Sequence, residues 1–167
     1  MVILPNNKNV RLAAEQVDAV VDQKVVVVAT ASIVEGFAAL LAYDPDASAV
    51  ENAALMGLSA QRVVAGEVTR AVRSTTTDAG EVREGDWIGL DARGVRSIAD
   101  SIAVAANALL ASLIHEGHEL VTIIEGDGAT PANTRRISEF LAEEYPALAV
   151  EVHHGGQPLY PYLFGVE

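Results

Sequence analysis

Apolar residues follow two different spacings in the first part of the chain. Residues 2–4 and 25–28 are short runs that are apolar throughout, which is typical of parallel strands buried on both faces. Between them, apolar residues recur at helical spacing over residues 10–21. The pattern predicts a strand, a helix capped by Asn7 or Asn9, and a second strand, which together form a βαβ unit.

Two more helices are expected before the spacing changes. Thr30 or Ser32 can cap a helix that runs through Ala42, and the turn-forming residues 43–46 then break it. A further helix is expected over residues 48–61.

After these helices the pattern favours antiparallel strands. Apolar residues at 64–72 lie among Thr, Arg and Glu, and a turn-rich stretch follows at 75–80. Residues 85–90 and 94–98 then predict a second hairpin.

The last third returns to alternating helices and strands. The expected elements are a helix capped by Asp100 or Ser101 and ending near Glu116, a strand at 119–125, a helix that begins at Thr130, and a strand at 148–152. Leu163, Phe164 and Val166 can then pair with the sheet.

The order of these elements predicts the fold class. Strands and helices alternate at both ends with hairpins between them, which favours an α/β fold, with α+β as the alternative. We expect two small lobes. The first, residues 1–45, holds the βαβ unit, and the second, residues 46–167, holds the antiparallel hairpins and a second α/β unit.

Composition narrows the functional classes. The chain has 167 residues, half of them hydrophobic, and 23 acidic against 11 basic residues give a formal charge of −12. This charge repels phosphate backbones and anionic headgroups, so we expect neither nucleic-acid nor membrane-surface binding. The apolar run at 25–29 is too short to span a bilayer, no export signal is visible, and cysteine is absent, so we expect a cytoplasmic protein.

Glu125 and Asp127 mark the best position for a small molecule. They follow a predicted strand and precede a helix, where open α/β sheets place their ligand crevice. The stretch lacks the dinucleotide and phosphate-loop glycine patterns, and its carboxylates would repel a phosphate unless a divalent cation intervened. A plain strand-to-helix turn explains the same residues.

The histidines give little support for a metal site. His153 and His154 are adjacent in a predicted strand, so they point to opposite faces and only one can enter a given site. His115 and His118 lie at a predicted helix end, where an imidazolium relieves the helix dipole. We therefore predict no metal ligands and no catalytic residues.

Three further places are candidates for ligand or partner binding. Asn6 and Asn7 stand where the first lobe could grip a polar ligand, although helix capping is the favoured explanation. Trp87 is expected to pack between lobes or sheet layers, or to mark a partner surface if exposed. The candidates near the C-terminus are His153, His154, Gly155, Gly156, Gln157 and Tyr160, in a stretch whose glycines and prolines set a sharp, stiff backbone.

Several stretches together resemble the C-terminal region of dihydroxyacetone-kinase-like proteins, a group that includes the kinase subunit of bacterial fatty acid kinase and members labelled "DAK phosphatase". The resemblance runs through the whole chain in order, at residues 3–9, 13–16, 66–73, 85–90 and 155–160.

The resemblance implies that ATP binding and partner binding belong to different domains of such proteins. Members of this group carry ATP and magnesium in a separate kinase domain, so the resemblance implies no cofactor in this chain and no catalytic residue to carry over. It implies that the C-terminal region resembles DegV-type fatty-acid-binding proteins in fold and binds such a partner.

Two other possibilities stay open from the sequence. The chain could be a metal-assisted phosphatase or hydrolase that uses Asp127, Glu125 and His153 around a cation. The turns at Asn6–Asn7 and Gly155–Gly156 could also bind a small ligand directly. An exposed sheet edge near residues 2–4 makes a homodimer a further expectation.

Overall fold

The computed structural model describes residues 1–167, which form two compact units, Met1–Val63 and Val64–Glu167. The boundary expected at residues 45–46 falls inside the first unit, between α2 (Ile33–Leu41) and α3 (Ala49–Ala60). These two helices pack against each other, so the break at 43–46 is a turn between neighbouring helices of one unit.

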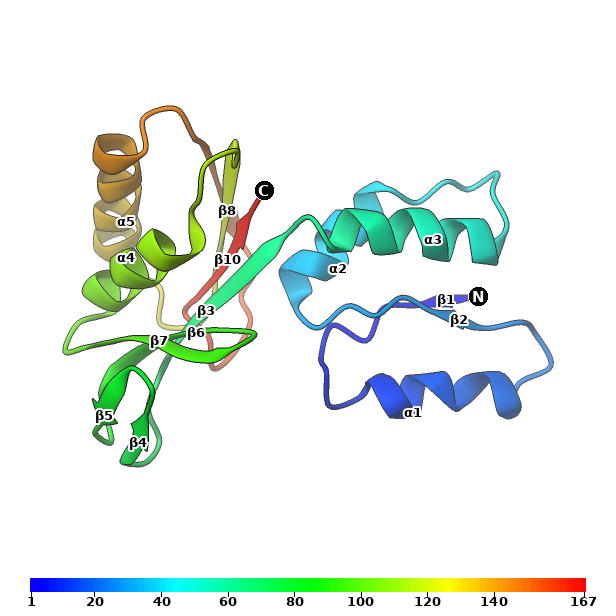
Figure 1. The fold of residues 1–167 in the computed structure, drawn as a ribbon, viewed down its shortest axis with the longest axis horizontal. Coiled ribbons are helices and arrows are strands. Elements are labelled where there is room, and N and C mark those ends of the chain that lie inside the picture. Colours follow the sequence, from blue (N-terminus) through cyan, green and yellow to red (C-terminus); the bar gives the residue numbers. More distant parts are fainter. The chain divides into compact units, whose positions relative to one another are not determined.

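The first unit begins with the expected βαβ arrangement. It contains β1 (Val2–Ile3), α1 (Arg11–Glu15), the short 3-10 helix η1 (Val17–Ala19) and β2 (Val26–Val27), and β1 pairs parallel with β2 (Figure 1). The predicted cap of the first helix is wrong. Val10 occupies the N-cap position, while the Asn7 side chain accepts from the Asn9 amide at 2.8 Å and closes a turn.

Both following helices begin at serine caps. The Ser32 hydroxyl accepts from the Glu35 amide at the start of α2, as the sequence predicted. Ser48 and Glu51 form a capping box at the start of α3, in which each side chain accepts from the other residue's amide. The two helices and β2 enclose a small core of Val28, Ala39, Met56 and Ala60.

The second unit is built on a six-stranded mixed sheet. Its elements are β3 (Val64–Arg70), β4 (Thr75–Thr77), β5 (Gly80–Val82), β6 (Trp87–Asp91), β7 (Gly94–Ala99), α4 (Ile102–Leu113), β8 (Leu120–Glu125), α5 (Pro131–Glu144), β9 (Ala149–His154) and β10 (Tyr162–Val166). The strand order is β7-β6-β3-β10-β8-β9, and β4 pairs with β5 in a separate hairpin. The combination of helices and mixed sheets confirms the predicted α/β class.

The hairpin expected around residues 75–80 is confirmed, because the short strands β4 and β5 pair there. Two other local expectations in this unit need correction. Ser101 occupies the N-cap position of α4, but no side chain makes a capping hydrogen bond there. The same helix ends at Leu113, before the expected position, because the next residue, Ile114, has an extended backbone.

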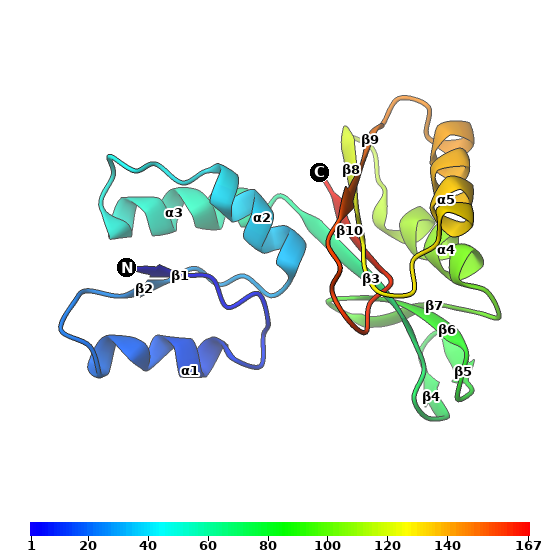
Figure 2. The ribbon, with the colours of Figure 1, turned by 180° about the vertical axis from the view of Figure 1, so that it is seen from behind.

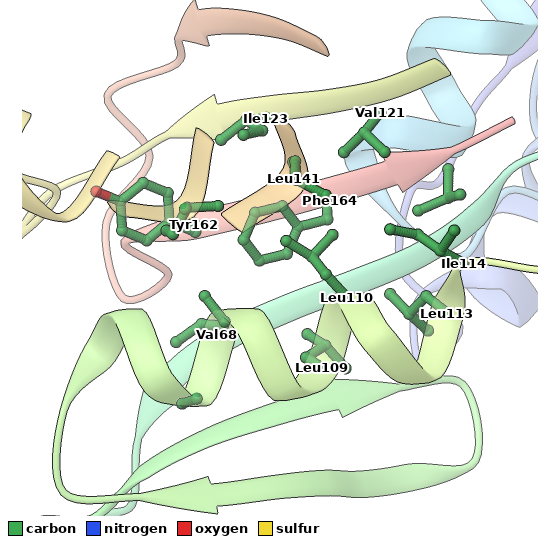
Figure 3. Packing of buried hydrophobic residues seen from close by; sticks show 14 of the residues in the cluster. Val68, Leu109, Leu110, Leu113, Ile114, Val121, Ile123, Leu141, Tyr162 and Phe164 are labelled. Carbon is green, nitrogen blue, oxygen red and sulfur yellow. The ribbon is translucent and has the colours of Figure 1, made fainter. Parts of the chain in front are cut away.

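Helices α4 and α5 both lie on one face of the sheet (Figure 1 and Figure 2). Figure 3 shows Leu109 and Leu110 of α4 packed near Phe164, which lies on the central strand β10. None of the helices has the length and apolar character that crossing a bilayer would require.

Side-chain alternation assigns residues to the two faces of this sheet. Val68 and Ile123 lie in the helix-covered core, so their neighbours Thr69 and Ile124 point to the opposite face. No helix of this unit covers that opposite face.

Candidate functional site

The closing segment, which we define as residues 155–161, lies against the carboxyl end of β8. It connects the edge strand β9 to the central strand β10 and therefore has to cross the end of β8. Its contacts with Ile124 and Thr69 place it on the helix-free face of the sheet. This arrangement brings most of the candidate residues near the C-terminus together with Glu125 and Asp127.

Backbone hydrogen bonds tie the closing segment to the loop after β8. The Gly155 and Gly156 amides donate to the Glu125 carbonyl at 2.8 and 3.0 Å. In the other direction, the Gly126 amide donates to the Pro161 carbonyl at 2.9 Å and the Asp127 amide donates to the Gln157 carbonyl at 2.8 Å. Two amides of this strand-to-helix turn, those of Gly126 and Asp127, are therefore already used within the protein and do not face a ligand.

Gln157 fills the centre of this junction with its side chain. The Nε2 atom donates to the Tyr160 carbonyl at 3.0 Å and to the Ile124 carbonyl at 3.3 Å. A Cβ atom on Gly126 would lie 2.3 Å from the Tyr160 carbonyl oxygen, and one on Gly155 would lie 2.2 Å from Gln157 Oε1. Backbone atoms thus require glycine at position 126, whereas the atoms close to Gly155 belong to the side chains of Gln157 and Ile124.

Leu159 is the most unusual residue of the closing segment. Its φ is 73°, a region that bulky L-residues rarely adopt, and its side chain is 77% exposed. The Thr69 hydroxyl donates to the Leu159 carbonyl at 2.8 Å and fixes this conformation from β3. The protein therefore holds an apolar side chain out to solvent on a strained, well-anchored backbone.

Tyr160 lies half-buried beside Leu159. The carboxylate of Glu67 raises the pKa of the Tyr160 phenol, and burial raises it further. The neutral phenol is thus kept as a hydrogen-bonding group next to an acidic side chain.

A polar network lies just beneath the junction. The Thr134 hydroxyl donates to the Glu125 carboxylate, and it lies 2.8 Å from the hydroxyl of Tyr162, which is fully buried. The Tyr162 hydroxyl also donates to the Thr130 carbonyl at 3.3 Å. Burial raises the pKa of Tyr162, while its hydrogen bonds with Thr134 and Thr130 lower it, and the net shift is upward.

The remaining ionisable candidates do not converge. Asp127 is exposed on the loop after β8. His153 and His154 are exposed at the end of β9, where His153 Nε2 lies 3.2 Å from Glu151 Oε2. No three His, Asp or Glu side chains are placed to hold one metal ion.

Trp87 occupies a different place from the closing segment. It begins β6 and packs half-buried against the helix-covered core, with the Arg70 guanidinium 5.8 Å from the ring centre. It therefore faces the opposite side of the sheet from Leu159 and Tyr160.

The candidates of the first unit form their own local arrangement. Asn6 has a φ of 53°, its amide donates to Thr30 Oγ1 at 3.1 Å, and its side-chain oxygen accepts from that hydroxyl at 2.8 Å. Asn7 closes the turn described above. A hollow of about 230 Å³ lies in this unit beside Val28 and Glu35, and neither asparagine lines it.

Sequence reasoning missed two residues of the site. Leu159 stands between two prolines in the sequence, and nothing in the pattern indicates its left-handed backbone. Thr69 lies ninety positions away, so its bond to the Leu159 carbonyl has no local sequence signal.

Comparisons with known proteins identify relatives over the whole chain. The model of the FakA-like C-terminal family, which takes its name from a component of fatty acid kinase, matches residues 1–167. An uncharacterised protein of Staphylococcus haemolyticus is 40% identical over 166 residues, and the protein YloV of Bacillus subtilis is 38% identical over 165 residues. The alignments cover 99% of this chain and 30% of each relative, so the chain spans about a third of their length.

Solved structures with little sequence identity share the fold. The dihydroxyacetone kinase of C. freundii matches with a TM-score of 0.62 and 16% identity, over 99% of this chain and 38% of its own. A DegV family protein from Corynebacterium glutamicum matches with a TM-score of 0.62 and 18% identity, over 99% of this chain and 73% of its own. A DegV family protein from Eubacterium eligens, loaded with heptadecanoic acid, matches with a TM-score of 0.60 and 12% identity, over 99% of this chain and 71% of its own.

The family match and these structures agree with the resemblance that the sequence motifs carried. The chain belongs to the FakA-like family of fatty acid kinase C-terminal regions.

Proposed function

We propose that this region is a non-catalytic docking module that binds a DegV-type fatty-acid-binding protein in the cytoplasm. In this proposal a separate kinase domain, which would hold ATP and magnesium, phosphorylates the fatty acid that the partner carries. The family supports the link to fatty acid kinase, and the shared fold supports kinship with DegV proteins.

The observation that carries the proposal is the exposed Leu159. Its backbone is strained, yet the closing segment is fixed to both β8 and β3 by hydrogen bonds. A strained conformation that presents an apolar side chain to water does nothing for the isolated fold, but it suits contact with a partner. Tyr160 beside it adds a half-buried phenol, the kind of side chain that is enriched in protein interfaces.

The segment's polar groups favour docking over chemistry. The Gly126 and Asp127 amides are bonded to the closing segment, and Glu125 accepts from Thr134. A metal-assisted phosphatase would need Glu125, Asp127 and His153 around one cation, so we place that function second.

The test is calorimetric titration of the chain with a DegV-type protein, once loaded with a long-chain fatty acid and once empty. We expect micromolar binding. Leu159→Gly should weaken it by about ten- to a hundredfold, because an interface that buries this leucine loses roughly 1.5–3 kcal/mol of apolar transfer energy. The same variant should keep its thermal stability, because glycine adopts a positive φ without strain.

Val72→Gly is the matched control. Val72 is 87% exposed in the same unit but lies outside the closing segment, so its removal should leave affinity unchanged. Equal loss of affinity in both variants, or no binding by either form of the partner, would refute docking through Leu159. Phosphate release by the chain alone, abolished by Asp127→Asn, would favour the phosphatase.

A further inference from the structure

Strand β9 forms an outer edge of the sheet in the second unit. It pairs with β8 on one side, and no strand of this chain pairs with its other side. Its side chains are exposed over most of its length, and Val152 is 43% exposed. Exposed edges are usually protected by lysine, proline or a bulge, and the sequence AVEVHH contains neither residue, while its pairing with β8 runs without a register shift.

The pairing with β8 fixes which backbone groups of β9 face outward. The amides of Ala149 and Gly155 donate toward β8, to the Glu119 and Glu125 carbonyls at 2.9 and 2.8 Å. Backbone groups alternate along a strand, so the peptide groups of Val150, Val152 and His154 point away from the sheet. These outward groups are available to a further strand.

We infer that β9 pairs antiparallel with β9 of a second copy of this chain, across a twofold axis at Val152. In a symmetric antiparallel pair, the outward peptide groups of one copy must face the outward peptide groups of the other. A twofold axis that passes through Glu151, Val152 or His153 meets this condition. The side chains decide among these three registers.

Hydrogen bonding between Glu151 and His153 selects the axis at Val152, because a carboxylate accepts from an imidazole N–H. An axis at Glu151 would set two carboxylates directly opposite each other, which is unfavourable. An axis at His153 would set Glu151 opposite Gly155, which has no side chain to bond the carboxylate. The axis at Val152 sets Glu151 opposite His153 of the other copy, in both symmetric positions, as closely spaced pairs without backbone hydrogen bonds. These two side chains already lie 3.2 Å apart within one strand, so they are on the same face and can form such a contact.

The other consequences of this register are also favourable. Each Val152 lies beside its counterpart on the opposite face from Glu151, and both lose exposed apolar surface. The formal charge of −12 on each copy opposes association, so added salt should strengthen the dimer by screening. A single strand pair is a small interface, and we expect a dissociation constant of roughly 10–100 µM.

Sedimentation equilibrium of the chain should therefore reveal a reversible species of twice 17.5 kDa, which becomes more populated as salt is raised. Val152→Pro removes an outward amide without touching the bonds to β8, so it should weaken the dimer at least tenfold while the far-ultraviolet circular dichroism stays unchanged. A chain that is monomeric at every concentration would overturn the inference.

Disulfide formation tests the register independently of the proline variant. The chain has no cysteine, so Glu151→Cys and His153→Cys each introduce a single thiol. The predicted pair places their Cα atoms about 4.5 Å apart, within the range of a disulfide, so an oxidised mixture of the two should give a linked dimer. Ala149→Cys mixed with His153→Cys is the control and should not link. Equal linking in the control, or none in the predicted pair, would refute this register.

Discussion

Replacing Gly126 with alanine should loosen the closing segment without touching any exposed residue. The added Cβ would lie 2.3 Å from the Tyr160 carbonyl oxygen, and 2.6 Å from both Gln157 Nε2 and the Gln157 carbonyl oxygen. Two of these three atoms belong to the backbone and cannot rotate away. The segment must therefore move outward from β8 by a substantial part of an ångström.

The magnitude follows from the bonds that this movement breaks. Three hydrogen bonds of 2.8–3.0 Å are affected. They run from the Gly126 amide to the Pro161 carbonyl, from the Asp127 amide to the Gln157 carbonyl, and from Gln157 Nε2 to the Tyr160 carbonyl. Each such bond contributes about 1 kcal/mol net. Their joint loss should lower the free energy of unfolding of the second unit by roughly 2–4 kcal/mol, a large part of the ~5–15 kcal/mol typical of a domain.

Urea unfolding followed by tryptophan fluorescence measures this loss. Trp87 is the single tryptophan and packs against the core of the second unit, so its emission reports that unit. Gly57→Ala, in α3 of the first unit, is the control and should leave this emission midpoint unchanged, because no atom lies within 4 Å of the added Cβ and the tryptophan reports the other unit. A Gly126→Ala midpoint equal to that of the wild type would refute the tight junction between the closing segment and β8.

Two further predictions concern the buried network and the first unit. Tyr162→Phe should lower stability by about 1 kcal/mol at neutral pH by removing the bonds to Thr134 and Thr130. The folded-state pKa of Tyr162 lies above its ordinary 10.0, so the stability that the neutral phenol contributes is present below about pH 10 and is lost as the pH rises further. The variant should therefore show a shallower decline of urea midpoints at alkaline pH than the wild type. An unchanged decline would contradict the burial argument. Gly36→Ala should destabilise the first unit by roughly 1–3 kcal/mol, since its Cβ would lie 2.3 Å from Asn6 Oδ1 and displace the bond to Thr30. Thermal melts should show recovery when Asn6→Gly is added, and no recovery would exclude this clash as the cause.

Residue patterns predicted the elements of both units because the local signals agreed with tertiary packing. The apolar runs at the start became β1 and β2, and Ser32 capped α2 as its position before an apolar helix predicts. The cap of α1 failed because the Asn7 side chain bonds two residues ahead and closes a turn instead. Short polar side chains have both options, and sequence spacing cannot distinguish them.

The candidate site was only partly predictable, for a physical reason. Glu125 and Gln157 could be singled out from the strand ends and the glycine-rich closing stretch, and these do lie together. Their roles depend on which backbone atoms approach each other, and this is set by the strand order that places β10 between β3 and β8. Leu159 gains its conformation from Thr69 on β3, a contact that no local pattern encodes.

The distribution of polar groups explains why an apolar contact should dominate docking here. The closing segment bonds the amides of Gly126 and Asp127, the carbonyls of Glu125 and Leu159, and the amide side chain of Gln157 within the protein. A partner that meets these bonded groups does not have to desolvate free donors or acceptors among them, so the affinity gained there depends on buried apolar area. The bond from Thr69 to the Leu159 carbonyl then has a consequence: it holds the backbone that directs the side chain outward, so binding loses little backbone conformational entropy at this residue.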